Sequence, residues 1–217
     1  GPLTIGVIPT IAPYILPDLL SMLAEAYPDL EPRFVEEQTQ HLITRLRNGN
    51  LDLAIMAIPS EATGMVDSPL YTEKFSIVCP PNHPIAGRED VQLSELKDLD
   101  LLLLDDGHCL RDQVVDLCRH ADVNPAEATN SVTRASSLTT IMQLVMGGLG
   151  CTLVPESALA TECHGKDVAI AHFASDVTAE REVGLVFRSS AARAEEFREF
   201  GTLITSAYNK AIERSRQ

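Results

Sequence analysis

The chain has 217 residues and a mass of 23.6 kDa, a size that fits either one large domain or two small ones. Its 17 Lys and Arg against 31 Asp and Glu leave a formal net charge of −14. This charge argues against binding of DNA or RNA by this chain itself, because affinity for nucleic acids depends on basic side chains that neutralise the phosphates. A hydrophobic fraction of 45% argues against disorder. No apolar run approaches the ~20 residues of a membrane helix, and no secretory pattern begins the chain. We therefore expect a cytoplasmic protein without membrane contact.

The first part of the chain alternates predicted strands and helices. Strands are expected at 3–8, 34–36 and 51–57, and helices over about 15–27 and between Gln38 and Gly49. Pro13 and Pro17 are expected at or near the first turn of the first helix, where a missing N–H costs little. This order of elements indicates a parallel sheet with crossover helices.

The rest of the chain continues the alternation. Strands are expected at 75–79, 101–104, 151–154 and 182–187, and helices at about 109–120, 138–146 and 191–214. Ser136 and Ser137 are expected to cap the helix that Gly147 and Gly148 end.

Together these elements predict an α/β fold of two units. Residues 1–75 and 178–217 would form the first unit, and residues 76–177 the second. Ligands of such sheets bind outside the carboxyl ends of the strands, often between two units. Thr10, Thr39 and the 105–109 turn are therefore placed at the edges of a candidate site.

Five cysteines, an odd number, are distributed along the chain without a C-x-x-C pair or the spacing of a zinc finger or zinc ribbon. In a cytoplasmic protein the default is a buried, reduced thiol. Cys79 and Cys151 lie in apolar strands and are predicted to be in the core. Cys163, followed by His164 in a polar segment with a glycine, is predicted to be at the surface.

Cys109 follows a predicted strand, a glycine and a histidine, and opens a predicted helix. The positive end of the helix dipole favours a thiolate at this position, as would a cationic His108 or Arg111. Asp105 and its acidic neighbours oppose this effect. From context alone, Cys109 is either a reactive thiol or a small helix-capping residue without chemistry.

Cys118 lies nine residues after Cys109. On a continuous helix nine residues leave the two side chains on opposite faces and about 13.5 Å apart along the axis. A disulfide requires Cα atoms about 4.4–6.8 Å apart. If the two cysteines pair, the segment must unravel, and oxidation would then act as a conformational switch.

Other sites have weak support in the sequence. His108, Cys109, Cys118 and His120 suggest a metal site, but no short Cys clip accompanies them. The glycines at 147, 148 and 150 do not form a dinucleotide fingerprint, and no phosphate-binding loop or hydrolase elbow is present. We expect no metal and no cofactor.

The run Asp106-Gly107-His108-Cys109-Leu110-Arg111-Asp112-Gln113, with Cys118 after it, resembles the peroxidatic-cysteine segment of the OxyR family, the hydrogen-peroxide-sensing LysR-type transcriptional regulators. The similarity extends over nearly the whole chain and includes Ile8-Pro9-Thr10, Pro13-Tyr14-Ile15-Leu16-Pro17, Glu37-Gln38-Thr39, Ala135-Ser136-Ser137-Leu138 and Gly184-Leu185-Val186.

This resemblance implies the regulatory half of such a regulator, with two Rossmann-like subdomains as in type 2 periplasmic binding proteins, joined by a hinge. In the family a winged helix-turn-helix precedes this region, and its absence from this chain would account for an acidic sequence in a DNA-binding family. The resemblance implies a regulator and not an enzyme. Its implied partners are hydrogen peroxide, further copies in a homodimer or homotetramer, and DNA through the missing domain, with RNA polymerase as a further candidate.

The resemblance also implies roles for individual residues. Cys109 would be the peroxidatic thiolate and Cys118 its resolving partner. A thiolate that attacks peroxide needs donors near the departing hydroxide, and the residues implied to bind peroxide are Thr10, Thr39, His108, Arg181 and Asp112. Outside this resemblance, the two threonines would be simple caps and Arg181, between two glutamates, a solvated charge.

Three hypotheses follow. The first, which we favour, is a redox-switched regulatory domain. The second is a LysR-type effector domain that binds a metabolite and whose cysteines are inert. The third is a thiol peroxidase, which repeated turnover with a thiol reductant would reveal.

Overall fold

The computed structural model describes residues 1–130 and 132–217. The chain folds into two units, each of which is described by itself. Unit 1 comprises Gly1–Glu73 and Arg181–Gln217, and unit 2 comprises Lys74–Glu180. Two long strands carry the chain from one unit to the other and back, β4 (Met65–Cys79) and β7 (Glu180–Arg188).

The sheet of unit 1 is built around its first strand, β1 (Pro2–Val7). Strands β2 (Glu31–Glu36) and β3 (Leu53–Ile58) lie on either side of β1 and run parallel to it, as the order of elements predicts. The next strand, β7, runs antiparallel to β3 and is followed in the sheet by β4.

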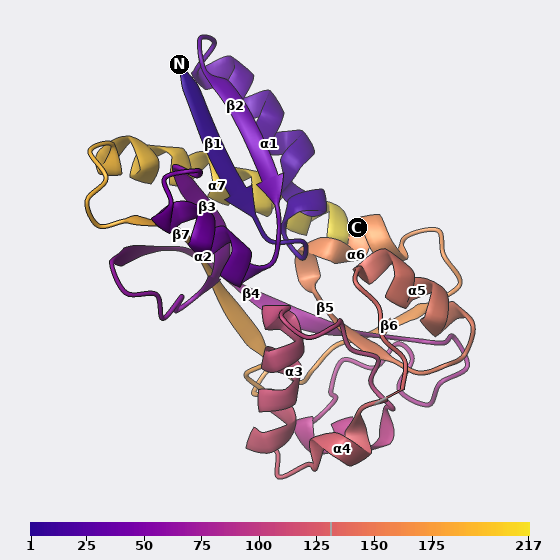
Figure 1. The fold of residues 1–217 in the computed structure, drawn as a ribbon. Coiled ribbons are helices and arrows are strands. Elements are labelled where there is room, and N and C mark those ends of the chain that lie inside the picture. The colour runs from indigo at the N-terminus through magenta and orange to yellow at the C-terminus, as the bar shows by residue number, and fades with distance from the viewer. Residues whose placement is uncertain (131) are drawn as a thin grey trace. The chain divides into compact units, whose positions relative to one another are not determined.

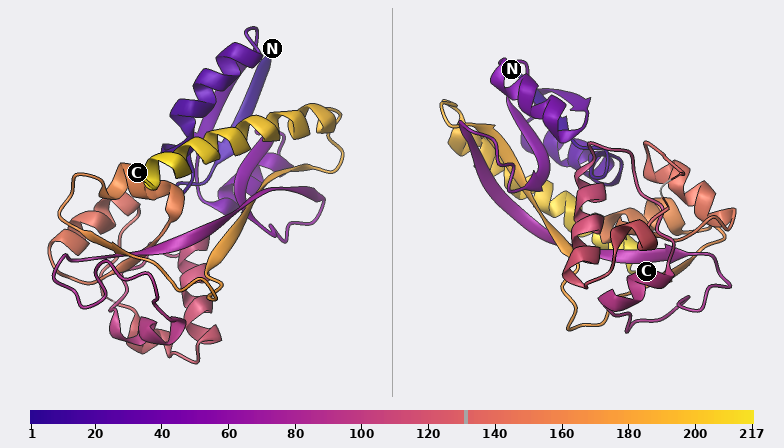
Figure 2. Two further views of the ribbon diagram at one scale, coloured as in Figure 1. Left: turned by 180° about the vertical axis from the view of Figure 1, so that it is seen from behind. Right: turned by 60° about the horizontal axis from the view of Figure 1, so that its bottom comes forward.

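Helices cover both faces of this sheet. Helices α1 (Ala12–Ala26) and α7 (Ala194–Ser215) pack against each other, and α7 is the long yellow helix in Figure 2. On the other face lies α2 (Thr39–Arg47), which approaches β1 closely at Gly6. A Cβ at Gly6 would stand 2.7 Å from the Leu42 side chain and 2.8 Å from the Leu51 side chain. A side chain at this position would force the Leu42 and Leu51 side chains to move.

Unit 2 has a small antiparallel sheet in which β4 lies between β5 (Thr152–Pro155) and β6 (Ala169–Ala171). Its helical elements are η1 (Leu93–Asp98), α3 (Cys109–His120), α4 (Pro125–Ala128), α5 (Leu138–Met146), η2 (Glu156–Ala158) and α6 (Leu159–Cys163) (Figure 1). The predicted cap of α5 is confirmed, because the Ser137 hydroxyl accepts a hydrogen bond from the Thr140 N–H at 3.2 Å.

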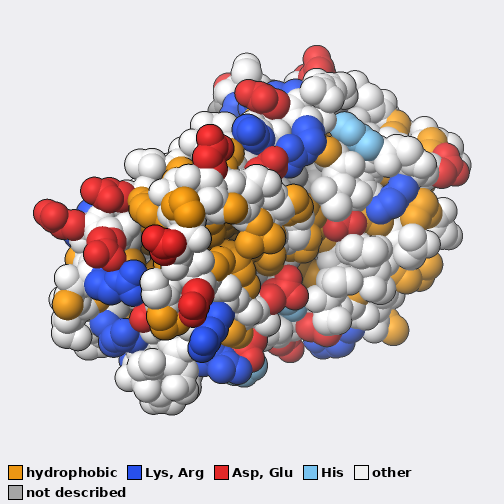
Figure 3. Space-filling model, turned by 90° about the horizontal axis from the view of Figure 1, so that it is seen from above, with side chains coloured by type: hydrophobic (Ala, Val, Ile, Leu, Met, Phe, Trp, Pro, Cys, Tyr) orange, Lys and Arg blue, Asp and Glu red, His pale blue; other side chains and the backbone are white. Residues whose placement is uncertain are grey.

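Charged side chains of both signs lie on the surface (Figure 3). On the face drawn in Figure 3, acidic and basic side chains are intermixed with exposed hydrophobic ones, and the sequence carries the net charge of −14. In the part of the chain that the structure describes, no helix combines the length and the apolar character that crossing a membrane requires.

Three local predictions are wrong. Residues 101–104 form only isolated bridges, at Leu101 and Leu104; this apolar run reflects burial of all four leucines and not a continuous ladder. Pro17 lies inside α1, because the helix begins at Ala12, earlier than the apolar spacing suggests. Cys163 is buried, because α6 turns its thiol inward to 3.9 Å from the Met142 sulfur.

Four cysteines are buried: Cys79, Cys118, Cys151 and Cys163. The prediction that Cys79 and Cys151 lie in the core is confirmed. Burial raises the pKa of each of them, for Cys151 and Cys163 to about 12. The unfolded thiols ionise near their ordinary value of 9.0. Below pH 9 these thiols are protonated in both the folded and the unfolded state, and their contribution to stability is fully present. As the pH rises from 9 toward 12, the unfolded thiols ionise first, and this contribution is lost.

We accordingly expect the free energy of unfolding to fall above pH 9, by roughly 1.4 kcal/mol per pH unit for each of Cys151 and Cys163. Urea denaturation at pH 8 and pH 10 measures this difference. The Cys151→Ala variant should show a smaller loss between the two pH values. An unchanged loss in that variant would contradict the assignment of the pH dependence to buried thiols.

Candidate functional site

A tight turn delivers Cys109 to the start of α3. Gly107 has φ +95°, a conformation that side chains other than glycine rarely adopt. His108 is the N-cap residue, and Cys109 is the first residue of the helix. The half-buried Cys109 thiol therefore lies at the end of α3 where unpaired N–H groups and the helix dipole favour an anion.

The side chains around this turn do not add a free positive charge. Arg111 lies 3.0 Å from Asp106 and also donates to the Leu104 carbonyl at 2.8 Å, so that it fastens the turn to the helix. Burial lowers the pKa of His108, against a smaller effect of Asp105, and so favours its neutral imidazole. The helix N-terminus is thus the main source of positive potential that this turn supplies.

Cys118 lies on the same helix as Cys109 and is fully buried. Burial raises the pKa of its thiol. Neither Cys109 nor Cys118 is in a disulfide, and the prediction of one continuous helix between them is confirmed. With about 13.5 Å of helix axis between them, the structure does not bring the two sulfurs together, and a bond between them requires α3 to unwind.

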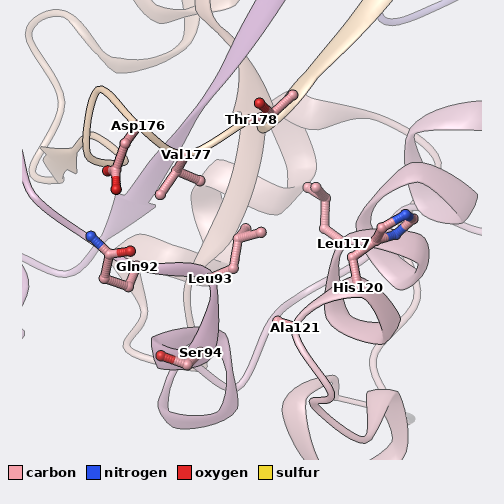
Figure 4. Close-up of a pocket in the computed structure, with 9 residues that line it drawn as sticks. All are labelled: Gln92, Leu93, Ser94, Leu117, His120, Ala121, Asp176, Val177 and Thr178. Atoms are coloured by element: carbon pink, nitrogen blue, oxygen red, sulfur yellow. The ribbon is translucent and has the colours of Figure 1, made fainter.

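An open pocket of about 640 Å³ borders the Cys118 end of α3. Figure 4 shows Leu117 and His120 on one side of this space and Gln92 and Val177 on the other. On its packed face α3 buries three side chains, those of Leu110, Val114 and Cys118. Few buried contacts and an adjacent open space are features of a segment that can open locally.

Gln113 lies one turn after Cys109 on the same face of α3. Its side-chain oxygen is buried and has no hydrogen-bond partner among the described residues. A buried acceptor without a donor calls for an explanation, and a small polar ligand is one.

In unit 1, Thr10 and Arg181 are buried and in direct contact. Arg181 Nη1 donates to the Thr10 hydroxyl at 2.7 Å, and Nη2 donates to the Thr10 carbonyl at 3.0 Å. The same guanidinium donates to Glu73 Oε1 through Nε at 3.1 Å and Nη2 at 2.9 Å. The side chains of Arg181 and Glu73 are completely buried.

The sequence did not single out Glu73. Arg181 stands between two exposed glutamates, but its partner lies 108 residues earlier in the chain. A weak signal was present, because Glu73 lies two residues before the buried Phe75 and four before the buried Ile77, in phase with the inward face of β4. A carboxylate in that phase is buried, and buried carboxylates are paired.

The remaining predicted site residues lie at helix starts. Thr39 is the first residue of α2 and is buried, whereas Asp112 is exposed in the first turn of α3. Unit 1 thus carries Thr10, Thr39 and Arg181, and unit 2 carries His108, Cys109 and Asp112. Among the described residues, no group of three or more His, Cys, Asp or Glu is arranged to hold a metal ion.

The LysR substrate binding domain family matches residues 1–208. The chain belongs to this family. Its fold, α/β with two subdomains of the periplasmic-binding-protein type, is the predicted one. This LysR substrate binding domain is OxyR-like, and the OxyR family consists of transcriptional regulators and not of enzymes.

Among curated proteins, the domain is similar to a probable hydrogen peroxide-inducible genes activator of Mycobacterium leprae. The two are 46% identical over 204 residues, which is 94% of this chain and 64% of the relative. The LysR substrate binding domain described here therefore spans less than two thirds of the length of that relative.

Among solved structures, the domain is similar to Corynebacterium glutamicum OxyR. A cysteine-to-serine mutant with hydrogen peroxide bound has a TM-score of 0.97 and 59% identity, over 100% of this chain and 67% of that chain. The oxidised form of the same protein has a TM-score of 0.87 and 57% identity, with the same coverage.

Proposed function

We propose that this domain senses hydrogen peroxide by oxidation of Cys109 and its pairing with Cys118. One observation carries the proposal. A half-buried thiol stands at the N-terminus of a helix, and a second thiol is buried nine residues along the same helix. The likeness to relatives named for the peroxide response, and to a structure with peroxide bound, supports it.

The chemistry has two steps. The Cys109 thiolate attacks one peroxide oxygen, so that an S–O bond forms, the O–O bond breaks, and its electron pair leaves as hydroxide, which takes up a proton to become water. The Cys118 thiol then attacks the sulfenic sulfur. An S–S bond forms, the S–O bond breaks, and the sulfenic oxygen leaves as water with the Cys118 proton.

Peroxide binding is assigned to Thr10, Thr39, His108, Arg181 and Asp112. The two hydroxyls, the guanidinium and the imidazole can donate hydrogen bonds to peroxide, whereas a carboxylate such as that of Asp112 accepts one. The buried contact between Arg181 and the Thr10 hydroxyl supports the assignment, as does the neutral His108 imidazole, which has one N–H to donate. Donors aimed at the departing oxygen lower the barrier to breaking the O–O bond.

The output of the switch would be a change of conformation. Pairing of the cysteines unwinds α3, and the new shape of unit 2 would alter a homodimer or homotetramer of the regulator. DNA binding would reside in a part of the regulator outside this chain, with RNA polymerase as a further partner and the cytoplasm as the place of action. The lower TM-score to the oxidised relative supports a change of conformation on oxidation.

Peptide mapping by mass spectrometry before and after one equivalent of hydrogen peroxide tests the proposal. The expected result is a new cross-link between Cys109 and Cys118 that a thiol reductant reverses. An unmodified Cys109 in a folded domain would overturn the proposal in favour of an effector domain that binds a metabolite.

The Cys118→Ser variant should separate the two chemical steps. We expect Cys109 to react with peroxide and to accumulate as sulfenic acid, because the resolving thiol is missing while the helix N-terminus is unchanged. Trapping with dimedone followed by mass spectrometry measures the adduct. A peroxide-induced disulfide from Cys109 to another cysteine in this variant would contradict the assignment of Cys118.

A further inference from the structure

We propose that Glu73 is a positioning residue of the peroxide site, which holds Arg181 so that Arg181 orients the hydroxyl of Thr10. This inference rests on the proposed function, because it takes Thr10 to be a donor to peroxide. Glu73, Arg181 and Thr10 form a buried chain of contacts within unit 1.

The direction of the hydrogen bonds sets the orientation of the Thr10 hydroxyl. A guanidinium can only donate, so the Thr10 oxygen must accept from Arg181 Nη1 at 2.7 Å. The single hydrogen of the hydroxyl then points away from the arginine. Thr10 is thereby held as a donor to a different acceptor, which is what a peroxide oxygen that gains negative charge requires.

Arg181 is held in this position from two sides. Within the described residues, Nε donates to Glu73, Nη1 donates to Thr10, and Nη2 donates to both. Four of the five N–H groups of the guanidinium are thus engaged. Arg181 therefore acts on the site chiefly through the direction of its bond to Thr10.

Glu73 is needed because the guanidinium is buried. An unpaired buried charge is strongly unfavourable, and the Glu73 carboxylate supplies the opposite charge in direct contact. Because the two charges cancel, the pair adds little net charge to the site. Its contribution to the site is the direction of its hydrogen bonds. Without Glu73, Arg181 would turn toward water, and Thr10 would lose the donor that orients it.

The position of the pair along the chain adds to this role. Glu73 is the last residue of unit 1 before the chain enters unit 2, and Arg181 is the first residue after it returns. The pair therefore ties the neighbouring strands β4 and β7 together where both leave unit 1. The orientation of Thr10 thus depends on both connecting strands.

The experiment compares two reactions of Cys109 in the 217-residue chain. The first is the rate of oxidation by hydrogen peroxide, which needs the oriented hydroxyl. The second is the rate of alkylation by iodoacetamide, which reports the availability of the thiolate. We expect Glu73→Gln to lower the ratio of the peroxide rate to the alkylation rate by about tenfold to a hundredfold. This effect is no larger than the one seen when a single well-placed hydrogen-bond donor is removed from an active site. Glu182→Gln, at an exposed position of β7, removes the same charge and should leave the ratio unchanged.

A second variant and a double-mutant cycle make the test decisive. Glu73→Asp keeps the charge, so the domain should stay folded, but the shorter side chain should also lower the ratio. In a Thr10→Val background, Glu73→Asp should have no further effect, because Glu73 acts through Thr10. An unchanged ratio in folded Glu73→Asp, or an equal further loss in the Thr10→Val background, would overturn the positioning role.

The wild-type chain distinguishes this proposal from the one on which it rests. If peroxide oxidises wild-type Cys109 no faster than it oxidises a small free thiol, the proposed function fails. If the wild type reacts rapidly and the Glu73 variants keep its ratio of rates, only the positioning role fails.

Discussion

Cys109→Ser is expected to abolish the peroxide-induced cross-link. A serine hydroxyl is not ionised at neutral pH, and the N-terminus of α3 cannot compensate for the difference in acidity between a hydroxyl and a thiol. Without a nucleophile at this position, no sulfenic acid forms for Cys118 to attack. Peptide mapping after peroxide treatment should show no disulfide at Cys118 and no oxidation at position 109.

The control for this prediction is Cys163→Ala, which removes a buried thiol on α6 of the same unit. This variant should still form the cross-link between Cys109 and Cys118. A peroxide-induced change of conformation that survives in Cys109→Ser would show that a different thiol or a different ligand operates the switch. Thermal denaturation of each variant confirms that the domain is folded.

Arg181→Ala is expected to have the largest effect on stability. The substitution leaves Glu73 completely buried and without the guanidinium that neutralises it. Removal of one partner from a buried ion pair typically costs about 3–5 kcal/mol. Urea denaturation at pH 7 measures the change in the free energy of unfolding. Arg33→Ala, at an exposed position of β2, should change it by no more than about 0.5 kcal/mol.

A double substitution distinguishes stability from function. Glu73→Leu together with Arg181→Met replaces the buried pair by apolar side chains of similar volume, and such replacements are often neutral or stabilising. We expect this variant to recover most of the stability that Arg181→Ala loses, and to remain slow with peroxide because Thr10 has lost its donor. A loss of stability as large as that of Arg181→Ala would show that packing, and not an uncompensated charge, causes the effect.

Local features of the sequence determined much of the fold. The first three strands and the helices between them follow from apolar spacing, and their parallel order follows from the β-α-β connection. The cap at Ser137 and the glycine of the 105–109 turn depend on neighbours within a few residues. The separation of Cys109 and Cys118 follows from the length of α3 alone, because a helix has a fixed rise per residue.

Burial and pairing of the polar groups became apparent only in the folded chain. Arg181 has two acidic neighbours in sequence, yet it pairs with Glu73 across 108 residues. The thiol of Cys163 is buried although its segment is polar, and the apolar run at 101–104 is buried without forming a regular strand. Periodicity and capping are local and can be read from a short window, whereas desolvation and charge pairing depend on every segment that surrounds a side chain.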